Sequence, residues 1–229
     1  MTEHMLNTKP LKPSRKVTKA TSLREQIYDF LRERIRTGQL TFEDRLVDVD
    51  IANEFGVSRM PVREALMQLV HDGMIESTTR GFVLRRFSDR EIEEIFEIRK
   101  LLEPAAAAGA AGTITPQALQ DMDRALEDCG RADKAGDSTA FILANAKFRS
   151  AWVAQVPNTQ LAAAILRFID HVQAVRLATL PNETVRKDVL QRMRAIHDAF
   201  KTRNAREAAR LVEKHVQAAL VFFRQQSDR

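Results

Sequence analysis

The segment DVDIANEFGVSRMPVREALMQL, residues 48–69, decides the fold of the N-terminal part of this chain of 229 residues. Its small residue Ala52 lies four positions before Gly56, a residue type that tolerates the positive φ angle of a tight turn. The surrounding apolar side chains are spaced so that two crossing helices can bury them against each other: Ile51, Phe55, Val57, Val62 and Ala65. The whole pattern predicts two helices that cross closely and are joined by a short turn.

The ends of these two helices can be placed from capping residues and apolar spacing. We expect the first helix from about Val49 to Phe55, with Asp48 as its N-cap. We expect Ser58 to cap the second helix, which continues to about His71 and tolerates a proline in its first turn.

The segments on either side complete a small domain. Residues 22–36 carry leucine and isoleucine at helical spacing, which predicts an amphipathic helix. After the crossed pair, residues 75–78 and 82–84 are β-prone runs that a turn at residues 79–81 joins into a hairpin. Three helices and a β-hairpin wing predict a winged helix-turn-helix over residues 21–87.

The rest of the chain, residues 88–229, repeats its apolar side chains with a period near that of the α-helix. Short loops separate the helical stripes, so we expect an antiparallel bundle of six or seven helices. The first helix should weaken at Gly109 and Gly112, and a single helix should run from Asn158 to Pro181. The predicted fold class is therefore mainly α.

Most of the net charge of +5 comes from residues 1–20, which we expect to form a flexible basic arm. This arm is either a solvated tail or a segment that gains affinity for a polyanion by releasing counterions. It lacks the apolar core of a secretory signal, and no stretch of the chain is apolar enough to span a membrane. The single cysteine, Cys129, excludes a disulfide framework and fits a cytoplasmic protein.

The start of the second crossed helix carries candidate DNA contacts. In a helix-turn-helix, this end enters the major groove and contacts base edges. Arg59 and Arg63 lie one turn apart there, and a guanidinium group can donate two hydrogen bonds to guanine. The alternative for this pair is a solvated helix face with Glu64 as partner, but within this motif we favour DNA contact. Ser58 and the free amides beside it could hold a phosphate.

Two other places could contact the duplex. Arg45 precedes the first crossed helix and could meet the DNA backbone or a neighbouring base. Arg80 and Gly81 form the tip of the wing, where a basic side chain beside glycine could enter the minor groove. For Arg45 and Arg80, a simple solvated surface position is an equally open alternative.

Residues 48–69, followed by DGMI and the wing sequence RGFV, resemble the winged helix of GntR-family bacterial regulators. The core GVSRMPVREAL is highly specific, although Met60 stands where threonine is more usual. Phe42-Glu43 replaces a usual Pro-Gly, so the turn before the first crossed helix can differ. By this resemblance, the DNA-contacting positions are Arg45, Arg59, Arg63 and Gly81.

The segment DREIEEIFEIRKLLEPAAAAGAA, residues 89–111, and the helices after it resemble the FCD-type effector domain of the FadR subfamily. Similar domains bind a carboxylate metabolite, often through a metal held by an Asp or Asn and three His. The matching positions in this sequence are Asn145, Arg149, Met193 and His215. A dication needs several nitrogen or oxygen donors, and Asn145 and His215 alone cannot supply them. The guanidinium group of Arg149 would also repel a cation, so we expect no metal and no cofactor. His197 could take the place of Met193 only if the match between this segment and the family's positions were shifted.

The same residues can be interpreted without the family. Asn145 and His215 interrupt apolar stripes, and Arg149 lies beside Asn145. Polar groups inside a bundle must be satisfied. One such residue suggests a structural network, whereas several on facing helices suggest a polar cavity. Arg149 would then anchor an anionic ligand, or else pair with an internal acidic residue. Arg99 matches a family arginine near the pocket, with an i,i+4 pair to Glu103 as the alternative.

These observations predict a sequence-specific DNA-binding transcription regulator. The resemblance implies a homodimeric repressor that binds double-stranded DNA at a pseudo-palindromic operator, although the residues themselves do not fix the sign of regulation. We expect a small carboxylate-containing metabolite in the bundle to control operator affinity. The alternatives are a bundle that only dimerises, or one that binds a larger acyl ligand. An all-α enzyme with an accessory winged helix is a more distant alternative, because we find no paired carboxylates, activated nucleophile or phosphate loop.

Overall fold

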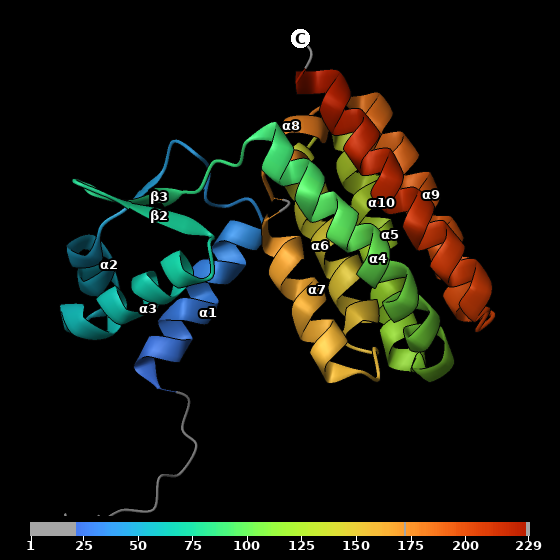
Figure 1. The fold of residues 1–229 in the computed structure, drawn as a ribbon, viewed down its shortest axis with the longest axis horizontal. Helices are drawn as coiled ribbons and strands as arrows, with labels where there is room; N and C mark the ends of the chain where they lie inside the picture. The colour runs from blue at the N-terminus through green and yellow to red at the C-terminus, as the bar shows by residue number, and fades with distance from the viewer. Residues whose placement is uncertain (1–21, 172, 228–229) are drawn as a thin grey trace, which may run out of the picture.

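The computed structural model describes residues 22–171 and 173–227, so the predicted basic arm of residues 1–20 lies outside the described residues. The described chain forms two lobes that lie side by side, a smaller one of helices and a sheet and a larger one of helices alone (Figure 1). Each lobe has its own cluster of buried apolar side chains. The mainly α class predicted from the sequence is confirmed.

The smaller lobe is a winged helix-turn-helix, as predicted. Its helices are α1 (Leu23–Arg36), α2 (Asp48–Phe55) and α3 (Arg59–His71). Its antiparallel sheet has the order β1-β3-β2, with β1 (Arg45–Leu46), β2 (Ile75–Thr78) and β3 (Gly81–Leu84). The side chains that hold these elements together are buried almost completely: Ile27, Leu31, Val62, Ala65, Leu66, Leu69 and Ile75.

The turn between α2 and α3 forms as the sequence predicts, because Gly56 adopts the left-handed conformation with φ +64°. The predicted N-cap of α2 is wrong. Val47 occupies that position without a side-chain cap, and Asp48 is the first helical residue. Ser58 does stand at the N-cap of α3, but its side chain makes no capping hydrogen bond.

The sheet contains one strand more than the predicted hairpin. In β1, Arg45 pairs with Val83 and Leu46 pairs with Phe82. A strand of two residues has no recognisable alternation, so only its pairing with β3 reveals it. This strand places Arg45 directly beside the wing.

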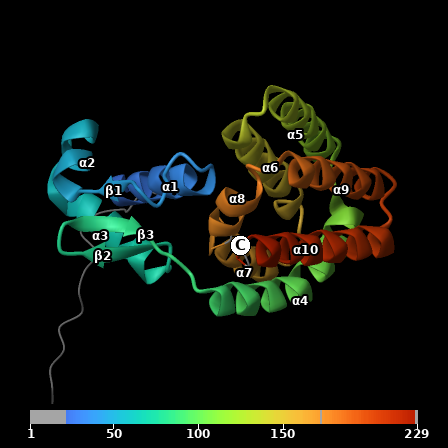
Figure 2. The ribbon, with the colours of Figure 1, turned by 90° about the horizontal axis from the view of Figure 1, so that it is seen from above.

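The larger lobe is a helical bundle. Its helices are α4 (Asp89–Thr113), α5 (Pro116–Ala135), α6 (Ser138–Val153), α7 (Thr159–His171), α8 (Gln173–Thr179), α9 (Glu183–Lys201) and α10 (Ala205–Ser227). Helix α10 lies along α4, while α5 packs against α6 and α9 (Figure 2). Large side chains fill the space between them, including Phe96, Phe141, Phe200, Met122 and Met193.

Helix α4 does not weaken at Gly109 and Gly112 but continues to Thr113. At Gly109 a Cβ atom would lie 3.3 Å from Cδ of Pro157, so glycine allows a close approach of another segment there. The single helix predicted from Asn158 to Pro181 appears as α7 and α8, on either side of residue 172, which lies outside the description.

The wing depends on Gly81, which begins β3 with φ +123°. A Cβ atom at this position would lie 2.6 Å from the carbonyl oxygen of Leu46, so a side chain would both strain the backbone and push β1 away. We expect Gly81→Ala to destabilise the winged lobe by about 1–3 kcal/mol. Gly130→Ala is the matched control, because no heavy atom lies within 4 Å of its added Cβ in helix α5.

Calorimetric unfolding of the full chain measures both effects. Gly130→Ala should stabilise the bundle by about 0.5–1 kcal/mol, since alanine has the higher helix propensity. A Gly81→Ala protein that unfolds at the same temperature as the wild type would contradict the role given to this glycine.

Candidate functional sites

The first candidate site is the exposed face of α3. Buried side chains on the opposite face, such as Val62 and Leu66, hold this helix against the rest of the lobe. The exposed face presents Met60, Arg63 and Met67 at helical spacing, and Met60 is 65% exposed. The lobe therefore offers a basic and partly apolar helix surface to solvent.

The two arginines at the start of α3 differ in their contacts. Arg59 donates through Nη2 to both carboxylate oxygens of Asp48, at 3.0 and 3.3 Å. This ion pair links the starts of α2 and α3. Arg63 is exposed and has no ion-pair partner within the described part of the chain, so the predicted alternative of a pair with Glu64 does not form.

The other predicted DNA contacts surround the wing. Arg80 is exposed at the turn between β2 and β3, and Thr78 Oγ1 donates to the carbonyl oxygen of Gly81 at 2.9 Å. Arg45 is exposed on β1, next to Gly81. The structure thus brings Arg45, Arg80 and Gly81 together, while Ser58 lies exposed at the start of α3.

The second candidate site is a cavity of about 40 Å³ inside the bundle. Four predicted residues line it together: Arg99, Asn145, Arg149 and His215. The apolar part of its wall includes Val185 and Phe222. Met193 lines a smaller neighbouring cavity of about 10 Å³ that shares three of those residues.

His197 does not join this group. Its Nε2 atom lies 3.3 Å from Oδ1 of Asp123 on α5, and it lines neither cavity. The prediction that His197 could contribute to the ligand pocket is not supported by its position, because it faces α5 instead of α4 and α10.

A buried ionic cluster stands at the centre of the site. Glu103 accepts from Arg99 Nε at 2.5 Å and from Arg149 Nη1 at 2.8 Å. Glu103 is 1% exposed and Arg99 is 3% exposed. Both alternatives weighed from the sequence therefore occur: Arg99 pairs at i,i+4, and Arg149 pairs with an internal carboxylate. Arg99 and Arg149 nevertheless still line the cavity.

The pKa shifts in this cluster follow from burial and charge. Burial alone would raise the pKa of Glu103, but Arg99 and Arg149 outweigh it and hold that pKa below the ordinary value. Burial lowers the pKa of Arg149, and the neighbouring Arg99 adds to this effect while Glu103 opposes it. With both guanidinium groups and Glu103 charged, the cluster carries one surplus positive charge.

Two buried nitrogen atoms at the site have no hydrogen-bond partner among the described residues. They are Nη1 of Arg99 and Nδ1 of His215. Unsatisfied buried polar atoms are rare in folded proteins and are costly when no ligand or water fills the space beside them. The arrangement can therefore receive a group that accepts hydrogen bonds and carries negative charge.

The same positions do not fit a metal ion. Arg149 places a cation where the resemblance expects a histidine, and Asn145 Nδ2 points its donor at Sδ of Met193, 3.2 Å away. Across residues 22–171 and 173–227, no three His, Cys, Asp or Glu side chains are grouped as metal ligands would be. The chemistry of this donor set favours an anion over a cation.

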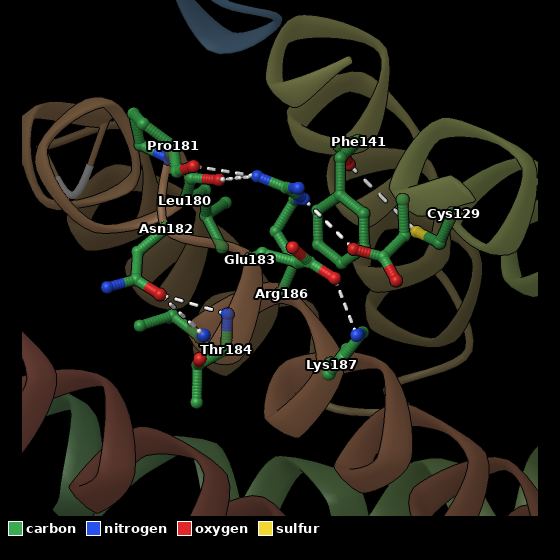
Figure 3. A network of polar contacts seen from close by, with 11 residues as sticks. Cys129, Phe141, Leu180, Pro181, Asn182, Glu183, Thr184, Arg186 and Lys187 are labelled. Atoms are coloured by element: carbon green, nitrogen blue, oxygen red, sulfur yellow. Dashed lines mark hydrogen bonds and ion pairs between the residues drawn. The ribbon is translucent and has the colours of Figure 1, made fainter. Parts of the chain in front are cut away.

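Arg186 is a supporting residue that the sequence reasoning missed. Its Nη1 donates to the carbonyl oxygens of Leu180 and Pro181, at 3.0 and 2.8 Å, and its Nε donates to Asp133 at 3.0 Å (Figure 3). These contacts fix the turn between α8 and α9, which supplies Leu180 to the cavity wall. An arginine near a predicted helix start gives no sequence signal for this role.

A hydrogen bond between α1 and α6 joins the two lobes. Arg36 Nη1, at the end of α1, donates to Oγ of Ser150 at 2.8 Å. Ser150 follows Arg149 in α6 and donates in turn to the carbonyl oxygen of Ala146 at 3.0 Å. Consecutive residues of α6 thus contact the ionic cluster and the winged lobe.

A membrane-crossing helix was not expected from the sequence. Among the helices of the described chain, none is long and apolar enough to cross a bilayer.

Comparisons with known proteins agree with this architecture. The family model "Bacterial regulatory proteins, gntR family" matches residues 23–83, and the model "FCD domain" matches residues 94–218, more than half of the chain. The solved structure of Escherichia coli McbR/YncC has a TM-score of 0.78 and 26% identity, covering 90% of this chain and 99% of that one.

Two curated relatives come from Bacillus subtilis. The HTH-type regulator YdhC is 27% identical over 202 residues, covering 87% of this chain and 90% of that protein. The gluconate operon transcriptional repressor is 30% identical over 168 residues, covering 73% of this chain and 63% of that protein. Because these families consist of transcriptional regulators, the enzyme alternative is set aside. The chain belongs to the GntR family of DNA-binding transcriptional regulators, in the FadR-like subfamily with a C-terminal FCD domain.

Proposed function

We propose that this regulator is a homodimeric repressor whose affinity for a pseudo-palindromic operator is controlled by a short organic acid bound in the bundle cavity. The observation that supports this proposal most strongly is the buried cluster of Arg99, Glu103 and Arg149. It has a surplus positive charge, and Nη1 of Arg99 has no hydrogen-bond partner among the described residues. A carboxylate supplies both the missing acceptor and the missing negative charge.

The proposal assigns a separate function to each of the two lobes. In this proposal, residues 21–87 bind DNA, and residues 88–229 bind the acid and dimerise. Two copies of α3 then enter successive turns of the major groove. The proposed contacts to DNA are Arg45, Ser58, Arg59, Arg63, Arg80 and Gly81.

The size of the cavity limits the acid. A buried water needs roughly 10–15 Å³ of such space, so a cavity of about 40 Å³ has room for a few water-sized groups. This room suits a carboxylate group with a few carbon atoms, so the alternative of a large acyl ligand is disfavoured. The described lining instead favours a short acid, with its carboxylate near Arg149 and its carbon atoms toward Val185 and Phe222.

His215 contributes hydrogen bonding without charge. Burial lowers the pKa of His215 to about 3, and Arg149 and Arg99 add to this effect while Glu103 opposes it. The ring is therefore neutral at physiological pH and has one donor and one acceptor nitrogen. With Nδ1 protonated, His215 donates to the carboxylate beside Arg99.

Helix α6 couples the acid to DNA binding in this proposal. Arg149 faces the acid and Ser150 holds Arg36 of the winged lobe, so a small displacement of α6 changes the contact between the lobes. The acid alters operator affinity only to the extent that it binds one arrangement of the lobes better than the other.

The experiment is a titration of the full protein with mono- and dicarboxylic acids of two to six carbon atoms, monitored by calorimetry and by fluorescence anisotropy of bound operator. We expect one group of these acids to weaken operator binding tenfold or more. Arg149→Leu should remove that response while leaving the operator Kd within about twofold, because Glu103 keeps Arg99 as its counter-ion. The matched control is Arg210→Leu, an exposed arginine on the same helix as His215.

Two results would contradict the proposal. Absence of binding by every acid would favour a bundle that only dimerises. A response of Arg149→Leu equal to that of the wild type and of Arg210→Leu would exclude Arg149 from the site.

The pKa of His215 also predicts a pH dependence of stability. Its folded value of about 3 lies below the unfolded value of about 6.5, so the unfolded state binds more protons between these pH values. The free energy of unfolding should therefore fall as the pH drops from about 6.5 toward 3. Urea unfolding between pH 4 and 7 should show a slope that is shallower by up to about 1.4 kcal/mol per pH unit in His215→Gln. Parallel curves for the two proteins would show that His215 is not buried in its neutral form.

A further inference from the structure

The exposed face of α3 contains an apolar side chain that the proposed contacts of its arginines with DNA do not explain. Met60, the second residue of α3, is 65% exposed, and Met67 on the same face is 49% exposed. Arg63 lies between them on this face, one turn from each. An apolar side chain therefore stands beside a free guanidinium on the surface that meets DNA.

Methionine cannot do what a residue with a hydroxyl group could do at this position, which is to donate a hydrogen bond to a phosphate. Its thioether has no hydrogen to donate and is a weak acceptor, so Met60 cannot donate to a phosphate. It is instead long, flexible and polarizable, and it adapts to irregular apolar surfaces. In the major groove, the apolar group that base pairs present is the C5 methyl of thymine.

We infer that Met60 contacts a thymine methyl group and so determines part of the operator sequence. The inference rests on the proposed insertion of α3 into the major groove. It assigns the apolar readout to Met60 and the polar readout to Arg63, whose guanidinium has no ion-pair partner in the described chain. Arg59 differs because it already forms an ion pair with Asp48 that links the starts of α2 and α3.

Helix geometry gives the expected position of this thymine. Met60 and Arg63 are three residues apart, about 4.5 Å along the helix axis. Successive base pairs are about 3.4 Å apart along the duplex. The thymine should therefore lie one or two base pairs from the guanine that Arg63 contacts.

Replacing thymine by deoxyuridine removes only the methyl group, which makes the test selective. The operator is first selected from random DNA with the full-length protein, and each thymine is then replaced singly. We expect one position per half-site at which this change weakens wild-type binding about three- to fivefold, the effect of burying one methyl group. Met60→Ala should bind the thymine and deoxyuridine operators equally at that position, and Met60→Leu should restore the difference.

Met67→Ala is the matched control, since it removes the other exposed methionine of α3 two turns farther from the helix start. It should keep the thymine preference. Retention of the full methyl effect in Met60→Ala, or wild-type indifference to deoxyuridine at every position, would overturn the inference. Arg63→Ala separates this outcome from failure of the proposed function, because loss of its guanine preference locates α3 in the groove independently. The assay contains no organic acid, so it does not depend on the effector.

Discussion

The interior of the helical lobe depends on two buried ion pairs, which Glu103 makes with Arg99 and with Arg149. Removing an ionised group from water costs several kcal/mol, and each charge persists there only because its neighbours compensate it. Glu103 and Arg99 lie on α4 and Arg149 lies on α6, so compensation also fixes these two helices relative to each other. Two cations share one anion, and this imbalance is the basis of the proposed preference of the cavity for a negatively charged ligand.

The position of this cluster connects the chemistry of the bundle with the DNA-binding lobe. Ser150 follows Arg149 on α6 and accepts from Arg36 at the end of α1. Helix α1 in turn packs against α3, which presents the proposed base contacts. A ligand that changes how Arg149 is held therefore acts close to the contact between the lobes. Arg149, at the position where the resemblance expects a metal-binding histidine, suits the proposed arrangement, because a guanidinium binds a carboxylate directly and needs no ion between them.

The sequence predicted the elements whose signals are local. Apolar periodicity located the helices, and Gly56 marked the turn of the helix-turn-helix. The sequence also suggested a polar cavity around Asn145, Arg149 and His215, because they stand in or beside apolar stripes of facing helices, and all three line the cavity of the bundle. Features that depend on distant partners could not be specified. Strand β1 exists only through its pairing with β3, and the internal acidic partner allowed for Arg149 could not be named, because Glu103 lies 46 positions away in the sequence. Local capping preference misplaced Asp48, whose carboxylate is used by Arg59 instead.

The central claim is that a carboxylate ligand and Glu103 compensate the same buried guanidinium groups. Thermal unfolding of wild type and Glu103→Gln, with and without the short acid that calorimetry identifies, tests it most directly. The variant leaves two buried cations without a counter-ion, so it should be less stable by roughly 3–5 kcal/mol without acid. The acid should then raise the unfolding temperature of the variant more than that of the wild type. Equal or smaller stabilisation of Glu103→Gln would contradict the account.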